Sequence, residues 1–129
     1  YKNAKVVTIE INKNAVKIAR NFIKKAGLSK RIKVVEGDAL KVLKKIKGKF
    51  DFLFIDAIKE EYLNYLKLAE KKLKKNAIVV ADNTGIFKSY LKDYLKYVRK
   101  SGKYESYSVK VKLEFSNLID EIEISIKKF

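Results

Sequence analysis

The sequence contains no cysteine and no histidine, and it also lacks proline, methionine and tryptophan. Without cysteine, disulfides and thiolate chemistry are excluded. Without histidine, the commonest general base and metal ligand is missing, which excludes serine–histidine triads and the usual zinc sites. No apolar run approaches the roughly 20 residues of a membrane-spanning helix. Any chemistry must therefore use carboxylates, amides, lysines, hydroxyls or a bound cofactor.

The charge is strongly unbalanced, with 31 lysines and arginines against 15 acidic residues and a formal net charge of +16 over 129 residues. Such a charge is typical of proteins that bind nucleic acid. Nearly all of it comes from dispersed lysines, however, and arginine, the better reader of phosphates and base edges, occurs only at positions 20, 31 and 99. We therefore keep nucleic acid as an alternative partner without favouring it. The length suits one domain spanning residues 1–129.

Apolar runs alternate with helical patterns along the first three quarters of the chain. Strands are predicted over 4–9, 32–35, 50–55 and 77–81. Helices are predicted over 12–26, 40–46, 62–73 and 87–98, and their spacing assigns four tyrosines to faces packed on the sheet: Tyr62, Tyr65, Tyr90 and Tyr94. Two further apolar runs, 104–113 and 122–126, have no helix between them and predict an antiparallel pair. The fold class is therefore α/β, a mostly parallel sheet with an antiparallel C-terminal hairpin.

An acidic residue stands at the end of each of the four predicted parallel strands, where ligands bind in such sheets: Glu10, Asp38, Asp56 and Asp82. A carboxylate such as Glu10 can accept both hydroxyls of a ribose. Asp38 can bind an adenine amino group, and Gly37 before it permits close approach of the backbone. Any single one of these residues is better explained by a turn or a helix cap. Four in register favour a nucleotide-type ligand site.

Three of the strand-end side chains form a sharper set: Asp56, Asp82 and Asn83. If their two strands are neighbours, their oxygens converge on one point, and Mg²⁺ prefers such hard oxygen ligands. Lys59 follows Asp56 by three residues and can lean over the same point. Beside a divalent cation and partly desolvated, its ammonium form is disfavoured, so it can act as a general base. Without the neighbouring oxygens Lys59 would be one more surface lysine.

Four segments carry a resemblance to a known family: VVTIEIN (Val6–Asn12), VVEGDA (Val34–Ala39), FIDAIKEEY (Phe54–Tyr62) and VVADN (Val79–Asn83). They resemble the S-adenosylmethionine-dependent, metal-dependent O-methyltransferases, which include the catechol and caffeoyl-CoA O-methyltransferases. The segment Lys112–Ile126 is similar to the closing part of the catechol enzymes. The resemblance implies a Rossmann-like class I methyltransferase sheet. It also implies methyl transfer from S-adenosylmethionine to a hydroxyl of a small catechol-like or other vicinal-diol acceptor, assisted by Mg²⁺ or another divalent cation.

The resemblance also implies roles for individual residues. Glu10 would bind the cofactor ribose, Ile11 would pack on the adenine, and the remaining residues expected to bind the cofactor are Gly37, Asp38, Ala39 and Asp56. The metal ligands would be Asp56, Asp82 and Asn83. Lys59 would be the general base, and Glu114 would orient the second hydroxyl of the acceptor.

Two departures from the family pattern change what we expect. Ala57 and Ile58 stand where the catechol enzymes carry an imidazole and an indole, so the pocket is more aliphatic and the acceptor need not be a catechol. The family's glycine-rich cofactor loop and the central strand before it would precede Tyr1. We therefore expect the C-terminal portion of a longer chain, with an N-terminally incomplete sheet and unpaired strand edges. We also expect these residues alone to be inactive and to bind S-adenosylmethionine poorly, which calorimetric titration would test.

Three other functions are compatible with parts of the pattern. A nucleic-acid methyltransferase would explain the charge, but enzymes that methylate base amines carry a proline-containing turn, and this chain has no proline. A nicotinamide-dependent dehydrogenase would use Glu10 but has no need for the oxygen set after the later strands. A catalytically inactive fragment or interaction module is the third. For partners and location we expect a small hydroxylated molecule, no membrane, a cytoplasmic protein and, as an option, a homodimer.

Overall fold

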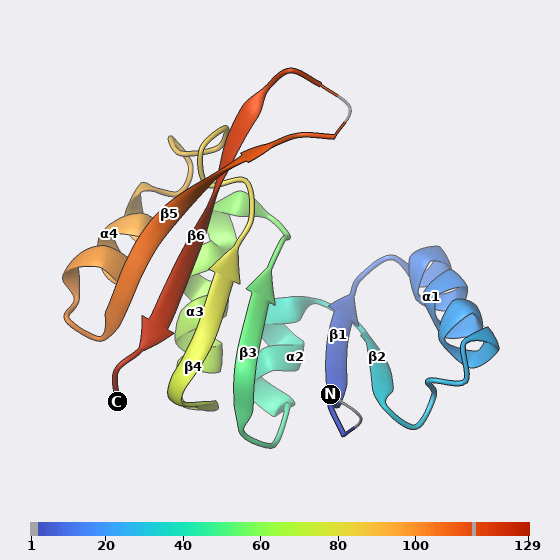
Figure 1. Ribbon diagram of the computed structural model, residues 1–129. Helices are drawn as coiled ribbons and strands as arrows, with labels where there is room; N and C mark the ends of the chain where they lie inside the picture. The colour runs from blue at the N-terminus through green and yellow to red at the C-terminus, as the bar shows by residue number, and fades with distance from the viewer. Residues whose placement is uncertain (1–2, 115) are drawn as a thin grey trace. The chain divides into compact units, whose positions relative to one another are not determined.

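The computed structural model describes residues 3–114 and 116–129, and it contains two compact units, one ending at Ile46 and the other spanning Lys47–Phe129 (Figure 1). The first unit has the order β1 (Val6–Glu10), α1 (Lys13–Lys25), β2 (Ile32–Glu36) and α2 (Ala39–Lys45). β1 and β2 are parallel and in register from Val6 opposite Ile32 to Glu10 opposite Glu36. This is one strand–helix–strand unit followed by a short helix.

The first helix begins where the sequence predicts. The Asn12 side chain accepts a hydrogen bond from the Ala15 amide at 3.0 Å, which caps α1. After the helix, Gly27 adopts φ +69°, a left-handed conformation that glycine enters without strain. α1 packs against β2 and buries Val16. The turn then leads directly into β2.

The second unit contains β3 (Phe50–Ile55), a 3₁₀ turn (Lys59–Glu61), α3 (Tyr62–Glu70), β4 (Leu73–Ala81), α4 (Lys92–Lys100), β5 (Tyr104–Lys112) and β6 (Ile119–Lys127). The sheet order is β3-β4-β6-β5. β3 and β4 are parallel, and β6 is antiparallel to both of its neighbours. The structure therefore confirms the predicted α/β class with parallel strands and an antiparallel C-terminal hairpin.

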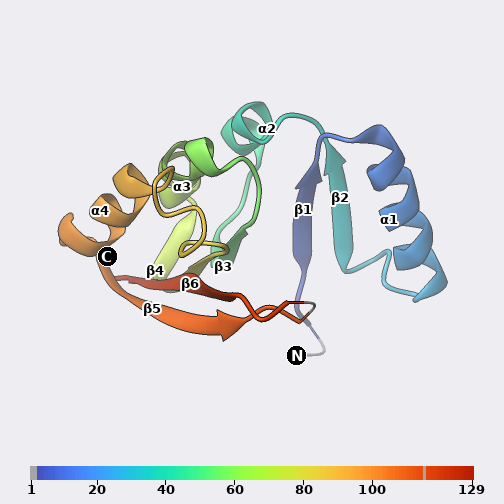
Figure 2. The same cartoon turned by 90° about the horizontal axis from the view of Figure 1, so that it is seen from above.

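The helices α3 and α4 lie on the same face of this sheet (Figure 2). The core between them includes Tyr62, Leu66, Tyr94 and Val98 from the helices and Val79 from β4, all fully buried. The rings of Tyr62 and Tyr94 meet edge to face, with centroids 5.8 Å apart. Burial of these apolar side chains holds both helices to the sheet and fixes the strand ends beside them.

The opposite face of β3 and β4 is exposed. Phe52 and Phe54 are each 55% exposed and Ile78 is 41% exposed, although parallel sheets are usually covered on both faces. Among the described residues β3 pairs only with β4, and β1 pairs only with β2. Within the described residues, β1 and β3 therefore each have one unpaired edge.

Two helix predictions are wrong at their boundaries. The helix expected over 62–73 ends at Glu70, because Leu73 pairs with Phe50 across the sheet and begins β4. The helix expected over 87–98 begins only at Lys92, since turns occupy the preceding residues. Tyr90 lies in those turns and is 55% exposed, so its predicted packing on the sheet is wrong. No helix among the described residues has the length and apolar character needed to cross a membrane.

Candidate functional site

The ends of β3 and β4 are neighbours, which is the condition for their end residues to converge. Ile55 pairs with Ala81, and the Asp82 amide donates a hydrogen bond to the Ile55 carbonyl at 3.0 Å. The residue after each strand, Asp56 and Asp82, therefore stands at the same edge of the sheet. Their adjacency follows from the parallel register and needs no special loop.

The Lys59 ammonium lies at the centre of a polar cluster at this edge. Its Nζ donates to Asp56 Oδ1 at 3.0 Å, to Asn83 Oδ1 at 2.8 Å and to the Tyr62 hydroxyl at 2.7 Å. Nζ also lies 5.5 Å from the centroid of the Phe87 ring. The structure thus brings together Lys59, Asp56 and Asn83, three of the residues singled out from the sequence. The Lys59 side chain is only 14% exposed.

Asp82 joins this cluster through its backbone and through its neighbour. Its carboxylate Oδ1 accepts a hydrogen bond from the Asn83 amide at 2.8 Å, and its carbonyl accepts one from the Tyr62 hydroxyl at 3.2 Å. The Asp82 carboxylate therefore contacts the backbone of the residue that follows it. Asn83 itself adopts φ +57°, a left-handed conformation that asparagine enters more readily than most residues.

The electrostatics of Lys59 differ from the sequence-based expectation. Burial acts to lower its pKa, but hydrogen bonds to Tyr62 and Asp56 outweigh burial, and the net effect raises the pKa of Lys59 above its ordinary value. For the Tyr62 hydroxyl, burial raises the pKa, and the hydrogen bond from the adjacent Lys59 ammonium offsets this increase only in part. In this arrangement the ammonium form is favoured, because Lys59 itself supplies the positive charge between the oxygens.

The oxygen set suits a hard divalent cation. Asp56 Oδ1 and Asn83 Oδ1 already converge on one positively charged nitrogen, and the Asp56 side chain is 49% exposed, so solvent reaches the cluster. Mg²⁺ takes a few such oxygens and completes its octahedron with water or substrate. In residues 3–114 and 116–129 no group of three or more acidic, histidine or cysteine side chains could hold a metal. The set predicted from the sequence instead combines two carboxylates with one amide oxygen, and of these the Asp82 carboxylate bonds the Asn83 backbone amide rather than Lys59.

Sequence reasoning missed two residues of the cluster. The helical spacing predicts only packing on the sheet for Tyr62, yet its hydroxyl accepts a hydrogen bond from the Lys59 ammonium. The spacing of three residues between Lys59 and Tyr62, about one helical turn, is the sequence feature that indicates this contact. Asp120 in β6 was not singled out, yet its carboxylate accepts a hydrogen bond from Asn83 Nδ2 at 2.9 Å. No local motif marks Asp120, because its partner is 37 residues away in the sequence.

The predicted cofactor residues of the first unit gather at the ends of β1 and β2. The Gly37 amide donates to the Glu10 carbonyl at 3.0 Å, which joins the two strand ends. Glu10 Oε1 accepts from the Asn12 amide at 2.7 Å, and Asp38 caps α2 by accepting from the Leu40 amide at 2.8 Å. Both carboxylates therefore also have local structural roles.

The other three predicted cofactor residues of this unit are Ile11, Gly37 and Ala39. Ile11 is 69% exposed, and Ala39 opens α2. Gly37 adopts φ +145°, and a Cβ there would lie 3.0 Å from a methyl of Val42. The backbone conformation therefore favours glycine at position 37, and a Cβ there would also require Val42 to shift.

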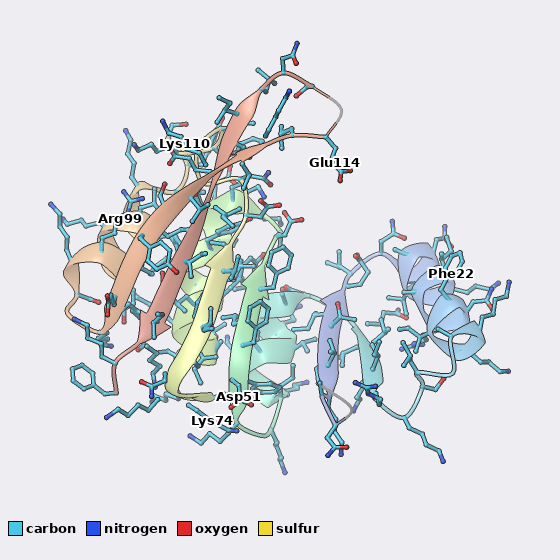
Figure 3. All side chains as sticks on the ribbon, viewed as in Figure 1. Phe22, Asp51, Lys74, Arg99, Lys110 and Glu114 are labelled. Atoms are coloured by element: carbon cyan, nitrogen blue, oxygen red, sulfur yellow. The ribbon has the colours of Figure 1, made fainter. Side chains whose placement is uncertain are left out.

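Glu114 is not brought into the Lys59 cluster. It lies exposed in the turn that connects β5 and β6 (Figure 3). No hydrogen bond or ion pair between described residues joins it to Lys59, Asp56 or Asn83. Its role with the acceptor stays a prediction.

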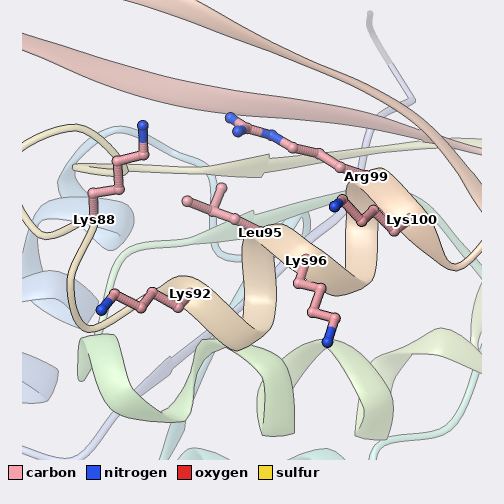
Figure 4. A pocket seen from close by; sticks show the side chains of 6 residues that line it. All are labelled: Lys88, Lys92, Leu95, Lys96, Arg99 and Lys100. Carbon is pink, nitrogen blue, oxygen red and sulfur yellow. The ribbon is translucent and has the colours of Figure 1, made fainter.

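A basic pocket lies along α4 and the turn before it (Figure 4). Its lining is Lys88, Lys92, Leu95, Lys96, Arg99 and Lys100. None of the site residues predicted from the sequence lines this pocket. The predicted metal ligands and Lys59 therefore lie at the strand ends and not in this basic pocket.

A Rossmann-like α/β sheet with polar side chains gathered at its parallel strand ends defines a class of ligand-binding domain. Within that class the chain belongs to the O-methyltransferase family, whose family model matches residues 2–112. Among curated relatives, catechol O-methyltransferase B of Danio rerio is 34% identical over 95% of this chain and 48% of that protein. Catechol O-methyltransferase of Sus scrofa is 31% identical over 98% of this chain and 70% of that protein.

Solved structures share the fold. An O-methyltransferase from Bacillus cereus in complex with SAH superposes with a TM-score of 0.87 and 23% identity, covering 96% of this chain and 63% of that one. The O-methyltransferase TomG from Streptomyces achromogenes in complex with SAM gives a TM-score of 0.89 at 19% identity, covering 97% of this chain and 62% of that one. The chain spans about half to two thirds of the length of most of these proteins.

Proposed function

We propose that this chain is the acceptor-side and metal-binding part of an S-adenosylmethionine-dependent O-methyltransferase that acts on a small vicinal diol with the help of a divalent cation. The observation that carries the proposal is the Lys59 ammonium held between Asp56 Oδ1 and Asn83 Oδ1. Membership of the O-methyltransferase family supports the reaction class. Two relatives named catechol O-methyltransferase support a diol as acceptor.

In this proposal Asp56, Asp82 and Asn83 hold the cation. When bound, Mg²⁺ supplies Lewis-acid activation of a hydroxyl group. Lys59 is the general base: beside a bound cation its ammonium form would be disfavoured, and the neutral Nζ would then accept the proton that the acceptor hydroxyl loses. Tyr62 holds Lys59 from the buried side, through the 2.7 Å bond between its hydroxyl and Nζ. The cluster thus places a proton acceptor directly beside the oxygen ligands.

The cofactor and the second acceptor hydroxyl are assigned to the remaining predicted residues. S-adenosylmethionine supplies the electrophilic methyl group when bound. Glu10 binds its ribose, Ile11 covers the adenine, and Gly37, Asp38 and Ala39 line the adenine edge. Glu114 orients the second hydroxyl of the diol. The bound SAH and SAM of two structures with this fold support the choice of cofactor.

A methyl-transfer assay on the full-length protein tests the proposal. With S-adenosylmethionine and catechol or caffeoyl-type acceptors, we expect activity that requires Mg²⁺ and disappears with a chelator. Lys59→Met should abolish it, whereas Lys88→Met, which removes a lysine outside the cluster, should leave it unchanged. Full activity in the presence of the chelator would remove the cation from the mechanism, and full activity of Lys59→Met would remove the base.

A further inference from the structure

We propose that Asp120 is a positioning residue that fixes which end of the Asn83 side-chain amide faces the Lys59 cluster. The inference rests on the proposed function, because it concerns the proposed metal ligand Asn83. Two contacts define the arrangement: Asn83 Nδ2 donates to Asp120 Oδ2 at 2.9 Å, and Asn83 Oδ1 accepts from Lys59 Nζ at 2.8 Å. The two ends of one amide thus meet groups of opposite hydrogen-bonding character.

The selection follows from the chemistry of the two groups. An asparagine amide has an oxygen end and a nitrogen end of similar size, so the side chain can turn by half a rotation without a change of shape. An ionised carboxylate accepts hydrogen bonds but donates none. Asp120 therefore accepts only the nitrogen end of Asn83, which leaves the oxygen end for the cluster. The reversed amide would direct two N–H donors at the cation and lose a ligand.

Asp120 is itself held in one position. It is 1% exposed, and its second oxygen, Oδ1, accepts from the backbone amides of Ile86 at 2.9 Å, Glu121 at 2.7 Å and Gly85 at 3.2 Å. The carboxylate cannot rotate without breaking several of these bonds in a buried place. The fixed group is therefore Asp120, and the amide of Asn83 adapts to it. Such support of a ligand by a neighbouring carboxylate typically changes metal affinity by about 10–100-fold when it is lost.

Mn²⁺ binding to the 129-residue chain, measured by electron paramagnetic resonance titration, tests the inference in a double-mutant cycle. In Asp120→Asn the new amide donates as well as accepts, so Asn83 is free to turn, and we expect the Mn²⁺ dissociation constant to rise by about 10–100-fold. In the Asn83→Asp background both ends of the ligand are oxygen. Adding Asp120→Asn there removes the repulsion between two facing carboxylates and supplies a donor to the new ligand, so the dissociation constant should not rise. An equal loss in both backgrounds would show a merely structural role and overturn the inference.

A second measurement separates this inference from the proposed function. If the wild-type chain binds no Mn²⁺, the proposed metal site fails, but the orientation of Asn83 is still measurable by NMR. The Asn83 side-chain amide protons should exchange with solvent slowly compared with those of the exposed Asn12, and faster in Asp120→Asn than in wild type. Exchange of Asn83 as rapid as that of Asn12 in the wild-type chain overturns the inference, even if Asp120→Asn does not fold.

Discussion

Replacing Arg99 by methionine should destabilise the chain strongly, because it leaves a fully buried carboxylate without its cation. Glu123 is 0% exposed, and Arg99 binds it through Nε at 2.8 Å and Nη2 at 2.6 Å. Ser106 is the only other side chain among the described residues with a hydrogen bond to this carboxylate, at 2.6 Å. Breaking a buried pair by removing one partner typically costs about 3–5 kcal/mol. Since the Arg99 side chain is 36% exposed and water can partly replace it, we expect the lower end, about 3 kcal/mol.

Urea unfolding followed by circular dichroism measures this loss. With a slope of about 1–3 kcal/mol/M for a small protein, the midpoint should fall by about 1–3 M. Lys103→Met is the matched control: it breaks the Lys103–Glu70 pair, whose lysine is 47% exposed, and should lower the urea midpoint much less than Arg99→Met does. The double variant Arg99→Met, Glu123→Leu should recover most of the stability, because no charge stays buried. A loss below about 1 kcal/mol in Arg99→Met would refute the reasoning.

Three further perturbations have defined outcomes. Burial acts to raise the pKa of Glu70, but hydrogen bonds from Lys103 and two tyrosines lower it overall. The stability that Glu70 contributes is therefore present above the ordinary glutamate pKa of about 4.3 and is lost as the pH falls below that value. Glu70→Gln should therefore lower the urea midpoint at pH 7, and the difference from wild type should shrink towards pH 3; a difference independent of pH would contradict this. Lys59→Met removes the ammonium that competes for the proposed metal oxygens, and the Mn²⁺ affinity of the chain should rise by about tenfold in a paramagnetic titration, whereas an unchanged or lower affinity would mean that the metal does not bind there. Gly85→Ala should cost about 1–3 kcal/mol in urea unfolding, because a Cβ would lie 2.8 Å from the Glu121 amide nitrogen, and a wild-type midpoint would show that the loop shifts freely.

The parts of the site that could be predicted are those fixed by local pattern and sheet topology. β3 occupies the predicted range 50–55, because an apolar run bounded by turn residues is unambiguous there. Because β3 and β4 are parallel neighbours, Asp56 and Asn83 stand at the same edge of the sheet. Lys59, three residues after Asp56, contacts both side chains. Given that the two strands are neighbours, the pattern of strand-end residues predicts the centre of the cluster.

The parts that could not be predicted depend on contacts between distant segments. Phe87 has the spacing of a helical core residue, but the turns before α4 place its ring beside the Lys59 ammonium instead. Leu73 continues the apolar spacing of α3, but pairing with Phe50 draws it into β4. Asp120 lies in the β6 strand, and nothing in the local sequence distinguishes it from other polar strand residues. Only the fold reveals its hydrogen bond to Asn83. In each case tertiary contacts override a local preference.

The predicted metal residues and most of the predicted cofactor residues lie in different units, and this determines what each experiment can separate. Asp56, Lys59, Asn83 and Asp120 all lie in Lys47–Phe129, and their contacts are internal to that unit. The predicted ribose and adenine residues lie in the other unit, at the ends of β1 and β2. The proposed metal binding and the amide orientation therefore depend on a set of contacts in which Asp56 is the one residue also expected to bind the cofactor. A chain that binds Mn²⁺ but not S-adenosylmethionine would be consistent with the strand-end cluster, and would locate the failure in cofactor binding rather than in the metal site.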